Sequence, residues 1–239
     1  MKRFQTHFFL IFILCSILVL LPSVNITKAA VANSYGWTTL QGNERRTGYT
    51  ASPSPDSNQT YWKFQTGGSI VSSPVAAEGM VFIASTGGHL YAINATTGTK
   101  IWDFSIVTDI NSPAIAHGKV FITSTSGTVY AINIYTGAVV WSQPLGETAG
   151  FGAPLIVGSR VFVNGNQTVF VFNEAAGVSL YSETIPHTNG IAPLTYDNSS
   201  YADGLIVAVA LRGTEIGLDG FEAKDGYGRF WVTLAPSGI

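Results

Sequence analysis

Cysteine is almost absent from this chain: Cys15 is the only one in 239 residues. It lies in an apolar N-terminal stretch that is predicted to be removed. The processed chain then holds no thiol, which excludes disulfides, thiolate metal sites, cysteine nucleophiles and haem attachment through a C-x-x-C-H motif. The folded part must therefore be stabilised by its own packed core.

The N-terminus has the pattern of a secretory signal peptide. Lys2 and Arg3 form a basic start, residues 8–21 form an apolar run of 14 residues, and Ala30-Val31-Ala32 offers a cleavage site between small residues. The run is too short to span a bilayer comfortably. We therefore expect residues 1–32 to direct export, which places the protein in the periplasm, outside the cell or at the cell surface.

Charge is also scarce, since only 11% of the residues are Asp, Glu, Lys or Arg, against about 25% in ordinary soluble domains. Without residues 1–32 the formal net charge is −5. No basic cluster occurs, so nucleic acid is excluded as an expected partner.

Beyond residue 32 no helical period persists for long. Apolar runs of about five residues, rich in β-branched and aromatic side chains and bounded by glycines, indicate strands. Clear examples are residues 80–84, 119–123, 160–163 and 205–211. The sequence predicts an all-β protein.

A repeat organises these strands. Residues 91–102 have the sequence YAINATTGTKIW, and residues 130–141, which are 39 positions later, have YAINIYTGAVVW. Aromatic landmarks follow at spacings of 40, 39, 40 and 50, and each unit keeps a proline and a turn glycine in the same order. A β-sandwich has no reason to repeat itself in this way, whereas a β-propeller does. The aromatic landmarks are Trp62, Trp102, Trp141, Tyr181 and Trp231.

The repeated string resembles the tryptophan-docking motif of the quinoprotein-type, or PQQ-like, β-propeller repeat family, which includes the propeller subunit of the outer-membrane β-barrel assembly machinery. Two copies match at every motif position, and the third, which ends at Tyr181, is weaker. The fourth copy fits only if its final aromatic is Phe230 rather than Trp231, and it carries extra residues around 196–203. The resemblance implies four-stranded antiparallel blades.

The motif has a physical reason to be structural rather than catalytic. Its Asn can cap a turn, its Gly can take a positive φ in a tight hairpin, and its Trp offers a flat face. In the family that face docks on the next blade. The expected blade-docking residues are Ala92, Asn94, Gly98, Trp102, Ala131, Asn133, Gly137, Trp141, Asn173, Gly177, Tyr181 and Gly226.

The repeats predict the organisation of the chain. A signal peptide (1–32) and an N-terminal segment that leads into the first blade (33–61) precede four repeats (62–101, 102–140, 141–180 and 181–230) and the start of a further one (231–239). Family members usually close with seven or eight blades. We therefore expect an incomplete ring and favour a truncated sequence over a small closed propeller or an arc that another chain completes.

Candidate binding residues lie in the loops that lead into the innermost strands, where propellers usually meet ligands. They are Asp109, Asn111, Glu147, His187 and Asn189. These residues form no nucleophile–base–orienter set and have no metal-ligand spacing, so no catalytic, cofactor-binding or metal-binding residue is assigned.

Three functions remain open at this stage. The favoured one is a non-enzymatic exported binding or scaffold module that contacts a protein or surface complex, or further blades of a longer chain or another chain. The second is a fragment of a quinoprotein dehydrogenase that holds pyrroloquinoline quinone over calcium, although the adjacent cysteine pair of the family's alcohol dehydrogenases is missing. The third is a cell-surface glycan-binding module.

Overall fold

The computed structural model describes nine stretches of the chain, namely residues 36–43, 45–49, 57–149, 152–184, 194–197, 204–212, 215–223, 225–226 and 230–236. All of them belong to the unit formed by Ser34–Ile239. The signal peptide predicted over residues 1–32 lies outside the described residues, as do His187 and Asn189. In the part that is described, no helix is long and apolar enough to cross a membrane.

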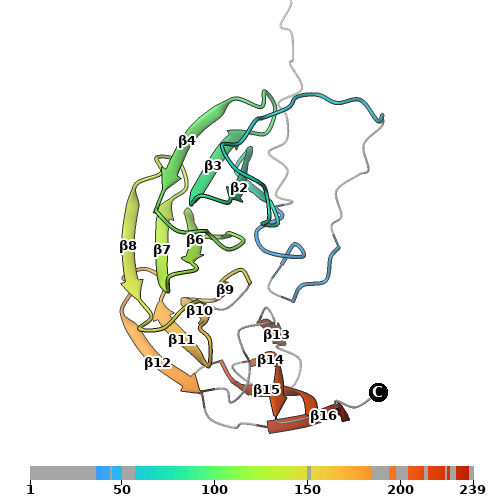
Figure 1. The fold of residues 1–239 in the computed structure, drawn as a ribbon, viewed down its shortest axis with the longest axis vertical. Helices are drawn as coiled ribbons and strands as arrows, with labels where there is room; N and C mark the ends of the chain where they lie inside the picture. Colours follow the sequence, from blue (N-terminus) through green and yellow to red (C-terminus); the bar gives the residue numbers. More distant parts are fainter. Residues whose placement is uncertain are drawn as a thin grey trace, which may run out of the picture. The chain divides into compact units, whose positions relative to one another are not determined.

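The described strands form four antiparallel sheets of four strands each, and within each sheet every strand pairs with its neighbour in the chain. Figure 1 shows the sheets following one another in chain order, from the green first sheet to the red fourth. The fold is therefore all-β, with the four-stranded antiparallel blades of a propeller. The first sheet contains β1 (Val75–Ala77), β2 (Met80–Ser85), β3 (His89–Asn94) and β4 (Lys100–Ser105). The second contains β5 (Ala114–Ala116), β6 (Lys119–Ser124), β7 (Thr128–Asn133) and β8 (Val139–Pro144). The third contains β9 (Leu155–Val157), β10 (Arg160–Asn164), β11 (Thr168–Asn173) and β12 (Ser179–Thr184). The fourth contains β13 (Thr195–Asp197), β14 (Leu205–Arg212), β15 (Glu215–Glu222) and β16 (Phe230–Pro236).

The hairpin between the third and fourth strands of a blade is built by the motif itself. In the first blade, Asn94 Oδ1 accepts hydrogen bonds of 2.9 Å from the backbone amides of Thr96 and Thr97. Gly98 then takes a φ of +72°, which lets the chain reverse without a Cβ clash. Asn133 and Asn173 cap the corresponding turns of the second and third blades in the same way.

Each core lies between two consecutive sheets. The phenylalanine at the third position of the second strand is fully buried in the first three blades, and three clusters of buried side chains join neighbouring sheets. Face-to-face packing of this kind makes each blade depend on its neighbours. Representative members from the two sheets of each cluster are Phe82 and Ile122, Phe121 and Val161, and Phe162 and Ile206.

A tryptophan anchors each of the first three hairpins. Trp102 is 9% exposed, and its Nε1 donates a 3.0 Å hydrogen bond to the carbonyl of Ile134 in the next blade. Trp141 makes the same bond to Glu174 O at 3.0 Å, and Trp62 to Ala95 O at 2.9 Å. In the third blade the hydroxyl of Tyr181 donates to Ala223 O at 2.7 Å.

The glycine of the motif makes room for the indole. A Cβ added at Gly137 would lie 2.9 Å from Cδ2 of Trp102, and one at Gly177 would lie 2.5 Å from Cδ2 of Trp141. These glycines also have φ values of +73° and +69°. The motif glycine therefore meets two requirements at once, a left-handed backbone and close approach of a ring.

The fourth blade keeps the strand pairing of the repeated motif but not its residue types. Ala92 pairs with Trp102 and Ala131 with Trp141, and at the matching place Gly220 pairs with Phe230. Strand β16 pairs with β15 and completes the fourth sheet. Residues 231–236 therefore lie in the outermost strand of the fourth sheet, just as Trp102 and Trp141, which open the second and third predicted repeats, lie in β4 and β8.

Burial also affects the Tyr181 contact. Desolvation raises the pKa of the Tyr181 hydroxyl to about 12. The hydroxyl therefore stays protonated, and able to donate to Ala223, throughout the neutral range.

Replacing Trp102 or Trp141 by Ala removes a buried ring and a hydrogen bond between blades. We expect each change to lower the free energy of unfolding by about 3–5 kcal/mol, measured by chemical denaturation. Tyr135→Ala is the control, because Tyr135 is 58% exposed and its loss should change stability little. A Trp→Ala variant that unfolds like the parent would show that the ring does not hold the blades together.

Candidate functional site

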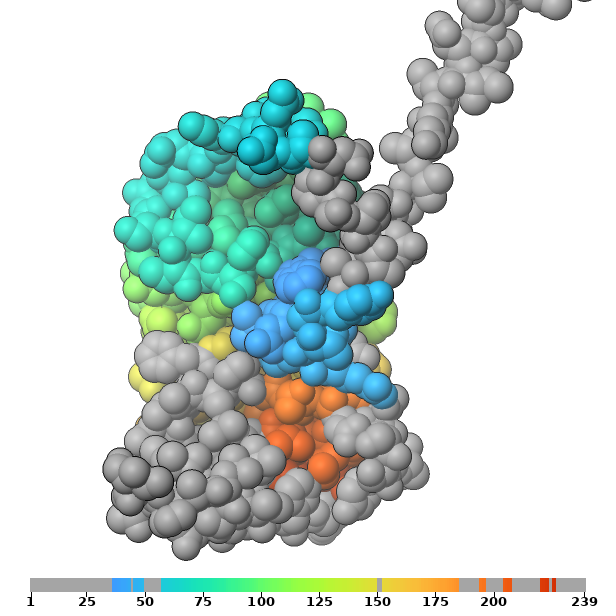
Figure 2. All heavy atoms as spheres, turned by 90° about the vertical axis from the view of Figure 1, so that its right-hand side faces the viewer, coloured from blue at the N-terminus to red at the C-terminus, as the bar shows by residue number. Residues whose placement is uncertain are grey.

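The residues before the first blade pack on the innermost strands of the sheets. Residues 36–43 and 45–48, which we call the N-terminal clasp, meet the first sheet where Ala76 N donates a 2.8 Å bond to Trp37 O. They meet the second sheet where Ile115 N donates a 2.6 Å bond to Thr38 O. Figure 2 shows these residues in blue, between the cyan residues of the first sheet and the orange residues further along the chain.

Arg46 extends the clasp to the third and fourth blades. Its Nη2 donates to Ala153 O at 3.4 Å, just before β9, and its Nε donates to Leu194 O, just before β13. A third bond of 3.2 Å, from Nη1 to Leu40 O, returns to the clasp itself. One side chain thus links the segment to the starts of two innermost strands.

The environment of Arg46 is unusual for a cation. Burial lowers the pKa of its guanidinium to about 10, so the group remains charged at neutral pH. Its hydrogen-bond acceptors in the described structure are backbone carbonyls. Their partial charges offset the cost of removing the cation from water.

The backbone of the clasp is strained at two residues, one of which is Arg46 itself. Gln41 and Arg46 have φ values of +60° and +52°, which non-glycine residues rarely adopt. The amide of Gly48 donates a 2.8 Å bond to Gln41 O and closes the turn. Such strain persists only where the surrounding contacts over-determine it, which is what the three guanidinium bonds provide.

Two cavities flank the clasp. The larger, of about 530 Å³, is lined by Trp37, Leu40, Gln41, Val81 and residues 73–76. The smaller, of about 230 Å³, lies where the clasp meets the second and third blades, and we call it the seam pocket. It is lined by Thr38, Thr39, Ile115, Ala116, His117, Ile156, Val157 and Gly158.

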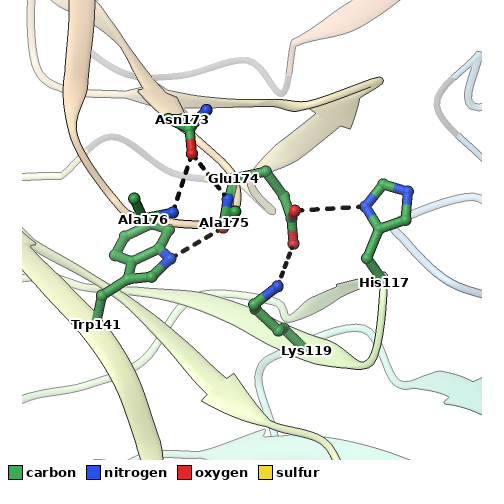
Figure 3. Close-up of polar contacts among 7 residues, drawn as sticks. All are labelled: His117, Lys119, Trp141, Asn173, Glu174, Ala175 and Ala176. Carbon is green, nitrogen blue, oxygen red and sulfur yellow. Dashed lines mark hydrogen bonds and ion pairs between the residues drawn. The ribbon is translucent and has the colours of Figure 1, made fainter.

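A charged cluster adjoins the seam pocket (Figure 3). Glu174 of the third blade is 6% exposed, and its Oε1 accepts a 2.8 Å bond from Lys119 Nζ of the second blade. Its Oε2 lies 3.6 Å from His117 Nδ1. The backbone carbonyl of Glu174 is also the acceptor for Trp141. Both the side chain and the main chain of this residue therefore tie the third blade to the second.

The loop residues expected from the sequence contact three different segments. Asp109 Oδ1 accepts a 2.8 Å bond from Gly87 N in the β2–β3 turn, and Asn111 Nδ2 donates a 2.9 Å bond to Thr123 Oγ1 on β6. Glu147 Oε1 accepts a 3.5 Å bond from Gln167 N in the β10–β11 turn. In the described structure these three side chains therefore fasten loops.

Sequence reasoning missed the residues that the structure brings together. Arg46 lies in a segment that was recognised only as leading into the first blade. Glu174 occupies the position that follows the turn Asn, where the two better copies of the motif have Ala95 and Ile134. A charged residue at a position that is apolar in the other copies was the available signal.

No group of three or more His, Cys, Asp or Glu residues that could hold a metal ion occurs in the described stretches. Around the clasp the described residues provide buried hydrogen bonds, the ion pair between Lys119 and Glu174, and two cavities.

Comparison with known proteins agrees with the fold. The family model described as outer membrane protein assembly factor BamB matches residues 45–109 and 106–229. No curated protein matches the chain.

Solved structures with the same fold include two classes of protein. A europium-containing methanol dehydrogenase aligns with a TM-score of 0.69 and 19% identity, over 85% of this chain and 49% of that one. BamB from Moraxella catarrhalis aligns with a TM-score of 0.60 and 20% identity, over 74% of this chain and 56% of that one. Quinohemoprotein alcohol dehydrogenase from Comamonas testosteroni aligns with a TM-score of 0.67 and 15% identity, over 88% and 42%. The chain spans about half the length of these structures, and at such identities the likeness is one of fold.

Removing the Glu174 charge should leave Lys119 without its partner, with a side chain only 17% exposed. We expect Glu174→Gln to lower the free energy of unfolding by about 1.5–3 kcal/mol. The double variant with Lys119→Met should regain part of the loss, because no unpaired charge is then buried. Chemical denaturation of the two single variants and the double variant measures the coupling.

The control for this cycle is Glu78→Gln. Glu78 is the first residue of the β1–β2 turn of the first blade and is exposed, so its replacement should change stability by less than about 0.5 kcal/mol. If Glu174→Gln behaves like Glu78→Gln, the cluster does not hold the second and third blades together.

Arg46→Gln should free the carbonyls of Ala153 and Leu194 from their shared donor. We expect a loss of about 1–3 kcal/mol and faster amide hydrogen exchange in β9 and β13 than in β6. The matched control is Arg45→Gln, because Arg45 directly precedes Arg46 and its side chain is exposed. Equal exchange rates in the two variants would contradict the role of Arg46.

Proposed function

Because this chain belongs to the PQQ-like β-propeller family, whose model is described as outer membrane protein assembly factor BamB, we propose that it is an exported, non-enzymatic binding or scaffold module for protein partners. The predicted signal peptide supports export, and the name of the family model supports a location at the cell envelope. The proposal rests mainly on one surface, which is formed by the outermost strands.

The outermost strands β4, β8 and β12 repeat an exposed aliphatic residue. Ile101, Val140 and Leu180 each directly precede the docked aromatic of their blade, and they are 45%, 48% and 45% exposed. Each strand is the last of its sheet and has one paired neighbour. Such edges carry free backbone donors and acceptors together with apolar side chains, which is what an added strand from a partner requires.

Strand β8 is the best candidate among the three. Exposed edges are usually protected by charge, and β4 carries Lys100 and Asp103 while β12 carries Glu183. The sequence of β8 is VVWSQP, without a charged residue, and Val139 and Val140 are both about half exposed. We therefore propose that an extended segment of a partner protein pairs with β8.

A quinoprotein dehydrogenase fragment is the second candidate. It is favoured by the alignment with dehydrogenase structures at TM-scores of 0.69 and 0.67, against 0.60 for BamB. This function would need groups that hold pyrroloquinoline quinone and a metal ion, and we assign no residue of this chain to that task.

The proposed contact can be tested with a photo-crosslinking residue placed at Val140. Irradiation in the native host should attach a discrete protein partner, whereas the same residue at Thr125, an exposed position in the β6–β7 turn, should not give that product. Val140→Lys should abolish the partner's co-purification without lowering the melting temperature. Identical products from positions 140 and 125 would contradict a binding edge at β8.

The purified protein tests the second candidate, a quinoprotein dehydrogenase fragment. Mixed with pyrroloquinoline quinone and Ca²⁺, it should show no stoichiometric quinone binding and no dye-linked oxidation of alcohols or sugars. Tight binding with turnover would overturn the non-enzymatic proposal in favour of the dehydrogenase.

A further inference from the structure

Residues 61–66 have the contacts of an outermost strand but no sheet of their own. Trp62 Nε1 donates a 2.9 Å hydrogen bond to Ala95 O of the first blade, as the tryptophans of β4 and β8 do to the blades that follow them. A Cβ added at Gly98 would lie 2.7 Å from Cδ2 of Trp62, and the motif glycines of the next two blades are as close to their indoles. Yet residues 61–66 belong to none of the four sheets that the described strands form.

The aromatic contacts of this segment also match those of β4. The ring centroids of Phe64 and Tyr91 lie 5.4 Å apart at 64°, and those of Phe104 and Tyr130 lie 5.5 Å apart at 60°. Along residues 61–66 exposed and partly buried side chains alternate, as in a strand with one face covered. The segment therefore lies against the first blade in the way that β4 lies against the second.

The segment covers one part of the first sheet and leaves another part open. Its two aromatic side chains pack on Ile83, Tyr91 and Ile93, which are 3–7% exposed. Val81 and Ala76, which pair with each other on the same face, are only partly buried. Both line the larger cavity beside the clasp, of about 530 Å³. An apolar part of this face is thus left without a neighbouring sheet.

The strand position of Val81 is closed at the other described junctions. The matching side chains of the next three blades are 0% exposed, and each belongs to a cluster with a phenylalanine from the second strand of the preceding blade. These pairs are Val120 with Phe82, Val161 with Phe121, and Ile206 with Phe162. Among the described residues no such phenylalanine faces Val81, and the cavity takes its place.

Residues 61–66 also determine what can cover this face. A complete blade, such as the fourth blade of a second copy, would bring its own outermost strand into the place that residues 61–66 occupy. All sixteen described strands already lie in complete sheets, so none of them is free to fill the gap. The unit that fits has three antiparallel strands, no outermost strand, and a small residue opposite Trp62, as Ala92 is opposite Trp102.

We propose that residues 61–66 and the open face of the first sheet bind the three inner strands of a further repeat of this kind, supplied by a partner polypeptide. Residues 61–66 become the outermost strand of a composite blade by backbone pairing with the third of these strands. A phenylalanine of the partner packs on Val81 and fills the cavity. This surface belongs to the first blade, is separate from the β8 edge and does not depend on the contact proposed there.

The test gives the full chain such a unit. A copy of residues 107–138, which contain β5, β6 and β7, replaces residues 57–59, so that it continues into residues 60–66 as the original continues into β8. Hydrogen exchange at the amides of residues 61–65 should slow on the order of tenfold or more, because paired amides exchange only when the pairing opens. The melting temperature should rise. The control insertion carries Phe121→Asp in the copy alone and should show neither effect, and equal exchange and melting in the two insertions would overturn the proposal.

A second comparison uses the chain without an insertion, so it does not depend on the folding of the inserted copy. Val120→Thr places an unpaired hydroxyl between two blades and should lower the melting temperature by roughly 5 °C. Val81→Thr should change it by less than about 2 °C, but should become as costly as Val120→Thr once the copy is inserted. The proposal fails if Val81→Thr is already as costly in the unaltered chain, since the face is then covered. It also fails if light scattering shows a dimer that Val81→Asp dissociates, since a second copy then covers the face.

Discussion

Each blade of this protein is held to the next by an aromatic side chain that donates a hydrogen bond to a backbone carbonyl. The carbonyls of Ala95, Ile134 and Glu174 accept indole N–H groups, and the carbonyl of Ala223 accepts the Tyr181 hydroxyl. The acceptor always belongs to the residue after the turn Asn or its counterpart. The N–H of the same residue donates to a backbone carbonyl just before the second strand of its own blade. Ala95 N, for example, donates a 2.9 Å bond to Gly79 O. One residue per blade therefore joins two hairpins and a neighbouring blade, which gives a physical reason for the turn to recur in every described blade.

Much of this fold could be predicted from local sequence. The apolar runs at 80–84, 119–123 and 160–163 agree with β2, β6 and β10 to within one residue, because alternating β-branched residues between turn glycines have few other structures available. Phe230 pairs with Gly220 as the shifted fourth motif required. The repeats were harder to divide, since the most visible landmark, the aromatic residue, lies inside the last strand and not at a boundary.

The candidate site could not be predicted, for a physical reason. Arg46 bonds to carbonyls 107 and 148 residues away, and backbone acceptors leave no mark on the sequence. The pairing of Lys119 with Glu174 spans 55 residues and two repeats. Side chains such as Asp109 and Glu147 attracted attention because they are polar and lie in loops, yet in the structure they cap turns. Residues that interact through the arrangement of blades become visible only when that arrangement is known.

The three junctions between consecutive described blades differ at one position, because the residue directly after the turn Asn or its counterpart is Ile134, Glu174 or Ala223. In a repeat protein built from identical units, no interaction specifies which unit lies beside which. Here the buried Glu174 accepts a neighbour that carries a cation at the position of Lys119, and an apolar residue there would strand its charge. The ion pair between Lys119 and Glu174 thus makes the order of the second and third blades specific. A chain in which recombination exchanged the second and third blades would lose this match even though every docking tryptophan was kept.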